Sequence, residues 1–204
     1  MAIRSGMSNL VQRLRNLTGA GTAEFVSGTV TYWTDDHLQA ILDGHYTHFA
    51  DRLLEWRTEQ INGTANYLNA QAPYKDLEEA ASGTARWAVR DSAGAFIGTA
   101  NYSVNYRSGE ISFGTVNQMG TAYYLTGYSY DVYLAAADVW LERMVKFTEY
   151  FKFSADNQTF DRQQVWEHAE KMEAKMRGKA GDNVIGSVSG DLHVGYFTRT
   201  DLNT

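Results

Sequence analysis

Cysteine is absent from the 204 residues of the chain, and proline occurs once, at Pro73. Without cysteine, the protein cannot use disulfides, thiolate-bound metals or cysteine nucleophiles, so packing alone must stabilise the fold. The chain also lacks an apolar run long enough to span a bilayer, and its first residues lack the apolar segment of a secretory signal. We therefore expect a protein that is made in the cytoplasm and has no membrane contact.

Basic residues are in the minority, because 18 Lys and Arg stand against 24 Asp and Glu and give a formal net charge of -6. Sequence-independent binding of nucleic acid depends on cations that neutralise phosphates, so this balance argues against it. Residues 1–20 are the exception, since they hold Arg4, Arg13 and Arg15 and no acid. Such a stretch is either the solvated face of an ordinary helix or a basic arm for an acidic partner.

Two stretches in the second half of the chain have the periodicity of amphipathic helices. Residues 130–151 and 165–177 repeat apolar residues at spacings of three, four or seven. The residues between them, 153–159, are rich in turn formers, and a short link between two such helices favours an antiparallel hairpin. We expect the apolar stripe to be hydrophobic core rather than a ligand site. Its members on the first helix are Tyr133, Ala137, Trp140, Met144 and Phe151.

The rest of the chain predicts two shorter helices and a β-rich segment. Ser8 can cap a helix that ends at Gly19, and Thr34 can cap one that ends at Gly44. From Gly63 to Gly127 short alternating segments are separated by turns, and the clearest hairpin lies at residues 102–113. This segment predicts a small antiparallel sheet inserted between helices. Residues 45–57 are too short a run for periodicity to decide between strand and helix.

Residues 130–142, the turn at 153–156 and the helix at 163–176 resemble the C-terminal half of head-tail adaptor (head-tail connector) proteins of long-tailed bacteriophages. A weaker similarity extends to residues 33–43, which look like the first helix of that family, and to the Tyr-rich segment that ends at Tyr130. Residues 1–25 and 180–204 are unmatched. The resemblance favours a strand for residues 45–57. None of the matching segments is a catalytic signature.

The predicted fold class is α+β. We expect a helical core with a long C-terminal antiparallel helical hairpin, an inserted small antiparallel β-sheet, and extended N- and C-terminal arms. The corresponding segments are an N-terminal helix or arm at 1–22, a helical core at 23–62 and 128–179, a β-rich insertion at 63–127 and a C-terminal arm at 180–204.

The resemblance implies a structural virion protein in the phage neck. A head-tail adaptor docks on the portal protein as a ring, expected to be a dodecamer, and connects it to the next neck, stopper or tail protein around the DNA channel. An acidic protein would let DNA pass without binding it, because like charges remove the gain from counterion release. Two alternatives stay open: a neck stopper or tail-completion protein, and an aromatic-rich ligand- or carbohydrate-binding module that uses Trp87, Tyr102 and Tyr106.

The sequence offers little to support an enzyme. The phosphate-binding loop GxxxxGK[ST] is absent, and so are GxGxxG, GxSxG and HExxH. His45, His48 and Asp51 share a face only if they lie on a helix, so a metal site there is a weak hypothesis. We expect no catalytic, cofactor-binding or metal-binding residues and no cofactor, with an unrecognised hydrolase as a minor alternative.

Both ends of the chain are candidate interfaces. At the N-terminal end the candidates are Arg13 and Arg15. Residues 184–198 alternate apolar and small polar residues without a neighbouring mate, so they would pair with another chain, add to the protein's own sheet or form a disordered tail. The candidate residues in this tail are Val184, Ile185, Val188, Leu192, Val194, Tyr196 and Phe197.

Overall fold

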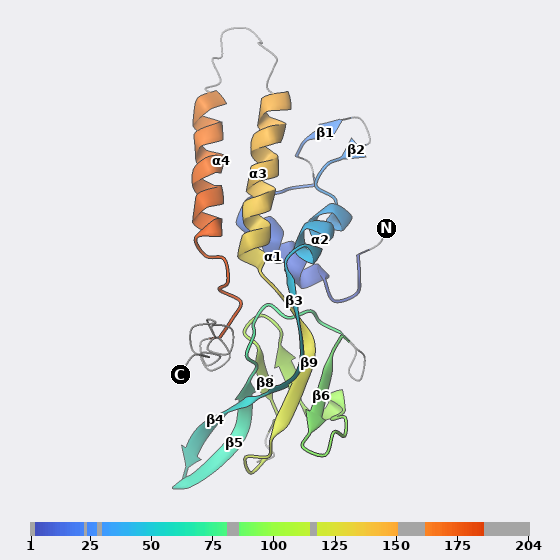
Figure 1. Ribbon diagram of the computed structural model, residues 1–204, viewed down its shortest axis with the longest axis vertical. Coiled ribbons are helices and arrows are strands. Elements are labelled where there is room, and N and C mark those ends of the chain that lie inside the picture. Colours follow the sequence, from blue (N-terminus) through green and yellow to red (C-terminus); the bar gives the residue numbers. More distant parts are fainter. Residues whose placement is uncertain are drawn as a thin grey trace, which may run out of the picture. The chain divides into compact units, whose positions relative to one another are not determined.

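The computed structural model describes residues 3–22, 24–27, 30–80, 86–114, 118–150 and 162–185 (Figure 1). Its α-helices are α1 (Ser8–Thr18), α2 (Asp35–Asp43), α3 (Val132–Tyr150) and α4 (Arg162–Arg177), and a 3₁₀ turn, η1, covers Thr99–Asn101. Its strands are β1 (Val26–Ser27), β2 (Val30–Thr31), β3 (Tyr46–Leu53), β4 (Glu55–Ile61), β5 (Thr64–Gln71), β6 (Ala88–Asp91), β7 (Ser103–Asn105), β8 (Glu110–Ser112) and β9 (Tyr123–Tyr130). Among the described helices, none combines the length and the apolar character needed to cross a membrane.

The chain forms two compact units. Unit 1 comprises Met1–His48, Glu78–Ala80 and Tyr128–Asn183, and unit 2 comprises Phe49–Leu77, Ala81–Gly127 and Val184–Thr204. The chain passes from one unit to the other within β3 and within β9, and also on either side of Glu78–Ala80 and after Asn183.

The core of unit 1 is built from the four helices. Apolar residues of α1, α2, α3 and α4 join one buried cluster, and Trp33, which precedes α2, belongs to it with no exposed surface. Ala135, Ala136 and Ala137 of α3 are all fully buried, and their small side chains leave room for large neighbours. The predicted cap of α2 is confirmed, since the Thr34 hydroxyl accepts a hydrogen bond from the His37 amide. The predicted cap of α1 is wrong, because Ser8 is the first residue of the helix, the N-cap is Met7 and no side chain caps it.

Two antiparallel sheets hold most of the strands. One has the order β4-β5-β8-β7 and the other the order β3-β9-β6, while β1 and β2 form a separate short pair. The predicted hairpin at residues 102–113 is confirmed as the antiparallel pair β7–β8. The preference for strand at residues 45–57 is also confirmed, because β3 and β4 occupy this stretch.

The predicted fold class is wrong in its architecture, although the chain is α+β. A long C-terminal helical hairpin is not seen: residues 151–161, which include the predicted turn at 153–159, lie outside the described residues. The expected helix at Tyr130 starts two residues later, because β9 continues through Tyr130. The sheets are not confined to an insertion at 63–127, since β3 and β4 precede it. The N-terminal segment is not an extended arm, because α1 packs into the core through Leu10, Val11 and Leu14.

Candidate interaction surface

The helices α3 and α4 of unit 1 pack against each other, and we call this pair the α3–α4 layer. An ion pair joins the two helices on one side of the layer. Arg177 of α4 lies 3.5 Å from Asp138 of α3 and 2.6 Å from Glu173 of its own helix. These three residues therefore share a side. On α3, Leu141 and Val145 follow Asp138 at spacings of three and seven, which places them on the same stripe of that helix. Their exposed fractions are 49% and 52%.

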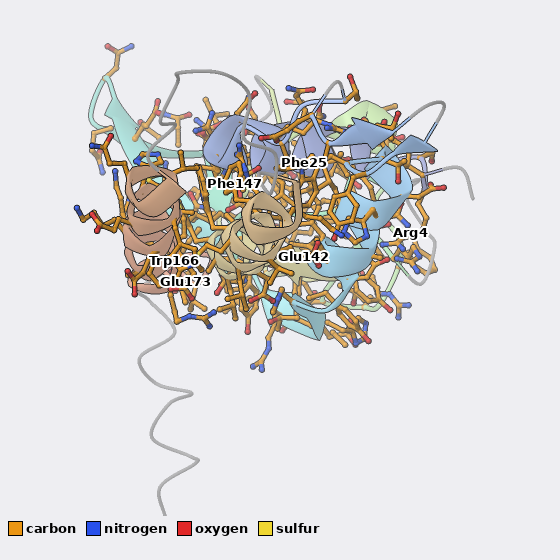
Figure 2. The ribbon with its side chains drawn as sticks, turned by 90° about the horizontal axis from the view of Figure 1, so that it is seen from above. Arg4, Phe25, Glu142, Phe147, Trp166 and Glu173 are labelled. Atoms are coloured by element: carbon orange, nitrogen blue, oxygen red, sulfur yellow. The ribbon has the colours of Figure 1, made fainter. Side chains whose placement is uncertain are left out.

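The matching stripe of α4 runs back from Arg177 through Glu173 and Glu170 to Trp166, at spacings of four, three and four. Figure 2 shows Trp166 and Glu173 on one side of α4. Trp166 is 41% exposed, which is high for a large apolar side chain. The two stripes together form a surface that we call the apolar side; it comprises Leu141, Val145 and Trp166, with Glu170 and Glu173 at its rim.

The opposite side of the same layer is basic. The His168 ring packs edge-on against Trp140 of α3, with their centroids 5.7 Å apart, so this flank of α4 faces away from the apolar side. Further along, the ring of Tyr133 is contacted by two cations, Arg13 of α1 at 5.5 Å and Lys179 at 5.1 Å from its centroid. Lys171 and Lys175 precede Lys179 at spacings of four and are exposed. We call Arg13, Lys171, Lys175 and Lys179 the basic side.

Of the two predicted N-terminal interface residues, Arg15 has its partners within its own chain. Its guanidinium pairs with Asp35 at 2.7 Å and donates hydrogen bonds to the backbone carbonyls of Ala20 and Trp33, and its side chain is 12% exposed. Arg15 thus ties α1 to the start of α2. Arg13 instead lies on the basic side, so the two predicted residues do not act together.

The predicted C-terminal interface is described only at its first two residues. Val184 forms an antiparallel bridge with Tyr74, and the Ile185 amide donates a hydrogen bond to the Pro73 carbonyl at 2.9 Å. Both contacts lie within unit 2, so this part of the tail pairs with its own chain. The other predicted members of this interface, Val188, Leu192, Val194, Tyr196 and Phe197, lie outside the described residues.

The histidines considered for a metal site have separate partners. His45 lies 2.6 Å from Asp138, whereas the His48 ring packs on Tyr128 with centroids 4.7 Å apart. His37 likewise meets Glu142 at 2.7 Å, so two His–carboxylate contacts fix the ends of α2 to α3. Across the described residues, no group of three or more His, Asp or Glu is arranged to hold a metal ion.

The aromatic residues of the alternative ligand-binding module, Trp87, Tyr102 and Tyr106, contribute to packing in unit 2 instead. Trp87 has no exposed surface and donates a hydrogen bond from its indole N–H to the Tyr102 hydroxyl at 3.1 Å. Tyr106 packs on Trp87 with centroids 5.2 Å apart. An open hollow of about 670 Å³ lies nearby in the same unit, and its aromatic lining residues, Tyr102, Phe113 and Tyr123, are each at most 8% exposed. These aromatic faces are therefore not available for stacking on a ligand.

A buried polar network in unit 1 joins residues that are distant in the sequence. The Arg4 guanidinium makes two 2.6 Å hydrogen bonds to Asp43, and further bonds to Glu78 at 3.3 Å and to the Tyr130 hydroxyl at 3.0 Å. Tyr130 in turn donates to Glu78 at 2.6 Å. The Glu78 and Tyr130 side chains are almost fully buried. The Glu78 carboxylate thus accepts hydrogen bonds from both Arg4 and Tyr130.

The network predicts a dependence of stability on alkaline pH. Burial, with the hydrogen bond and charge of Glu78, raises the pKa of Tyr130 well above its usual value. The folded protein therefore keeps this proton where the unfolded chain loses it, so the free energy of unfolding should fall as pH rises above about 10. Measured by urea unfolding between about pH 9 and 11, the free energy of unfolding should fall less steeply with pH for Tyr130→Phe than for the wild type. Equal slopes would contradict the prediction.

Of the residues that define the two sides of the α3–α4 layer, only Arg13 was predicted from the sequence as an interface residue. Leu141, Val145 and Trp166 are large apolar residues that fall off the expected inward stripe, and this offset was the available signal. The signal for the basic side was the repeat of Lys171, Lys175 and Lys179. Comparison with known proteins adds no further signal: no protein-family profile matches the chain, and no curated protein sequence matches it significantly.

Proposed function

We propose that this chain is a structural virion protein of a long-tailed bacteriophage, a head-tail adaptor that docks on the portal vertex and carries the next neck or tail protein. One observation carries the proposal. The segments that resemble the adaptor family, 130–142 and 163–176, also supply Leu141 and Trp166 of the apolar side. Exposed apolar residues grouped on two packed helices are typical of a protein-binding surface.

The charge of the chain supports the same proposal. A net charge of -6 disfavours a grip on DNA, as a protein around a DNA passage requires. The expected assembly is a ring of copies, a dodecamer by the resemblance, in contact with the portal protein on one face and with a stopper or tail protein on the other. A stopper or tail-completion protein is the second candidate, because it would use an apolar side in the same way.

Gel filtration with light scattering tests the proposal. The purified protein is run alone, then with the portal complex of its own phage, at micromolar concentration. We expect stable co-migration with the portal complex and a mass that corresponds to a ring of copies. The test variant is Trp166→Ala, on the apolar side. The control variant is Trp56→Ala, in unit 2. If the wild type does not co-migrate with the portal complex at these concentrations, the adaptor assignment is rejected.

A further inference from the structure

The basic side of the α3–α4 layer holds two cations against one aromatic ring. The Arg13 guanidinium of α1 lies 5.5 Å from the centroid of the Tyr133 ring, and the ammonium of Lys179, in the segment that follows α4, lies 5.1 Å from it. The ring attracts each cation, but the two like charges repel each other across it. An anion that binds beside both cations would replace this repulsion with attraction.

The lysines of the basic side have no acidic partner within the described part of the chain. Lys171, Lys175 and Lys179 form no ion pair there, although Glu167 stands four residues before Lys171 and Asp182 three residues after Lys179. Four arginines of unit 1 are instead neutralised by carboxylates of the chain itself. They are Arg4, Arg15, Arg143 and Arg177. The basic side therefore keeps positive charge that the fold does not neutralise, on a chain of net charge -6.

We infer that the basic side is a binding surface for an acidic segment of a partner protein. Lys171 and Lys175 stand one turn apart on α4, about 6 Å along its axis. Carboxylates at every fourth position of a partner helix have the same spacing, so they can pair with the two lysines in succession. A further carboxylate of the same segment would lie beside Arg13 and Lys179, where it relieves their repulsion.

An acidic polypeptide fits the basic side better than nucleic acid or a second copy of the chain. Nucleic-acid binding gains its free energy by neutralising many phosphates, and four cations on a chain of net charge -6 provide little of it. A second copy would offer the acids of α4, but Arg177 lies 2.6 Å from Glu173 and already pairs with it. A partner segment that carries carboxylates without cations has neither disadvantage.

The inference does not rest on the proposed function, since its test needs no portal protein. The probe is a fluorescein-labelled helical peptide with glutamate at every fourth position, and the control peptide has glutamine at the same positions. Fluorescence anisotropy measures the binding of each peptide to the full chain at about 0.01 M and about 0.3 M salt, where screening differs strongly. We expect the glutamate peptide alone to bind, and to bind more weakly at the higher salt concentration.

Two double variants test whether the lysines make the contact. Lys171→Gln with Lys175→Gln removes two charges at exposed positions, so the fold should be kept and the dissociation constant of the glutamate peptide should rise about fivefold. Lys171→Arg with Lys175→Arg keeps both charges and should bind like the wild type. The control is Arg52→Gln with Arg57→Gln in unit 2, which changes the net charge equally and should leave the dissociation constant unchanged.

Three outcomes would overturn the inference. The first is that the wild type does not bind the glutamate peptide, or binds the glutamine peptide equally well. The second is that the variant Lys171→Gln with Lys175→Gln binds the glutamate peptide like the wild type. The third is that single-stranded DNA of the same charge binds more tightly than the peptide and is weakened by the same variant, which would identify nucleic acid as the occupant. Peptide binding without co-migration with the portal complex would reject the proposed function and support this inference.

Discussion

Replacing Arg4 with alanine is expected to lower the free energy of unfolding by about 3 kcal/mol, because the change leaves buried acceptors without their cation. Arg4 makes a bidentate contact with Asp43 and further hydrogen bonds to Glu78 and Tyr130. These contacts, led by the one to Asp43, raise the pKa of Arg4, so it stays charged in the fold. The value lies at the lower end of the range for buried pairs because Arg4 and Asp43 are each about a third exposed.

Urea unfolding of the full chain measures the Arg4 effect. Arg57→Ala on β4 is the matched control, since Arg57 is exposed and its loss should change stability by no more than about 0.5 kcal/mol. Arg4→Lys keeps the charge but loses the bidentate contact with Asp43. Its free energy of unfolding should therefore lie between those of Arg4→Ala and Arg57→Ala. If Arg4→Ala and Arg57→Ala unfold at the same urea concentration, the network does not hold the N-terminal segment.

Gly109→Ala is expected to destabilise unit 2 by about 3–4 kcal/mol, from a strained backbone and a steric clash together. Gly109 has φ of +74°, and a Cβ there would lie 2.2 Å from the Tyr74 carbonyl oxygen. The backbone cannot simply move away. The Gly109 carbonyl accepts a hydrogen bond from the Ala72 amide, and its amide donates to the Asn105 carbonyl, both at 2.8 Å. The turn between β7 and β8 is thus tied to the end of β5.

The control for Gly109 is Gly94, which has φ of +82° and no heavy atom within 4 Å of the position that a Cβ would occupy. Gly94→Ala should therefore cost only the backbone strain, about 1–2 kcal/mol. Thermal and urea unfolding of the two variants separate strain from clash. Equal losses would show that the Tyr74 carbonyl yields to the added methyl group, against the expectation.

Local features of the fold could be predicted because their signals lie close together in the sequence. The cap at Thr34 and the hairpin β7–β8 each depend on a few adjacent residues. The Arg4 network could not be predicted in this way, since its partners lie 39, 74 and 126 residues away. Periodicity reports which face of an element is apolar, but it does not identify the element that packs against it.

The same limit explains the error in architecture. Residues 46–61 and 123–130 form strands because β3 pairs with β9 and β4 pairs with β5, and the first of these pairings joins distant segments. The helical pattern of the sequence extends back to Tyr130, but Tyr130 lies in a strand because β9 pairs with other strands of its sheet. The candidate surface could have been predicted from the sequence, since helix geometry fixes the positions of Leu141, Val145 and Trp166 relative to the inward stripe.

Hydroxyl-radical footprinting of Leu141, Val145 and Trp166 tests most directly whether the apolar side is an interaction surface. The residues are labelled in the dilute protein, in the concentrated protein and in the presence of the portal complex, with exposed Tyr46 and Leu53 of β3 as references. We predict that assembly strongly reduces labelling of the three residues while the references stay reactive. Equal labelling of the apolar side in all three samples would contradict the assignment of this surface.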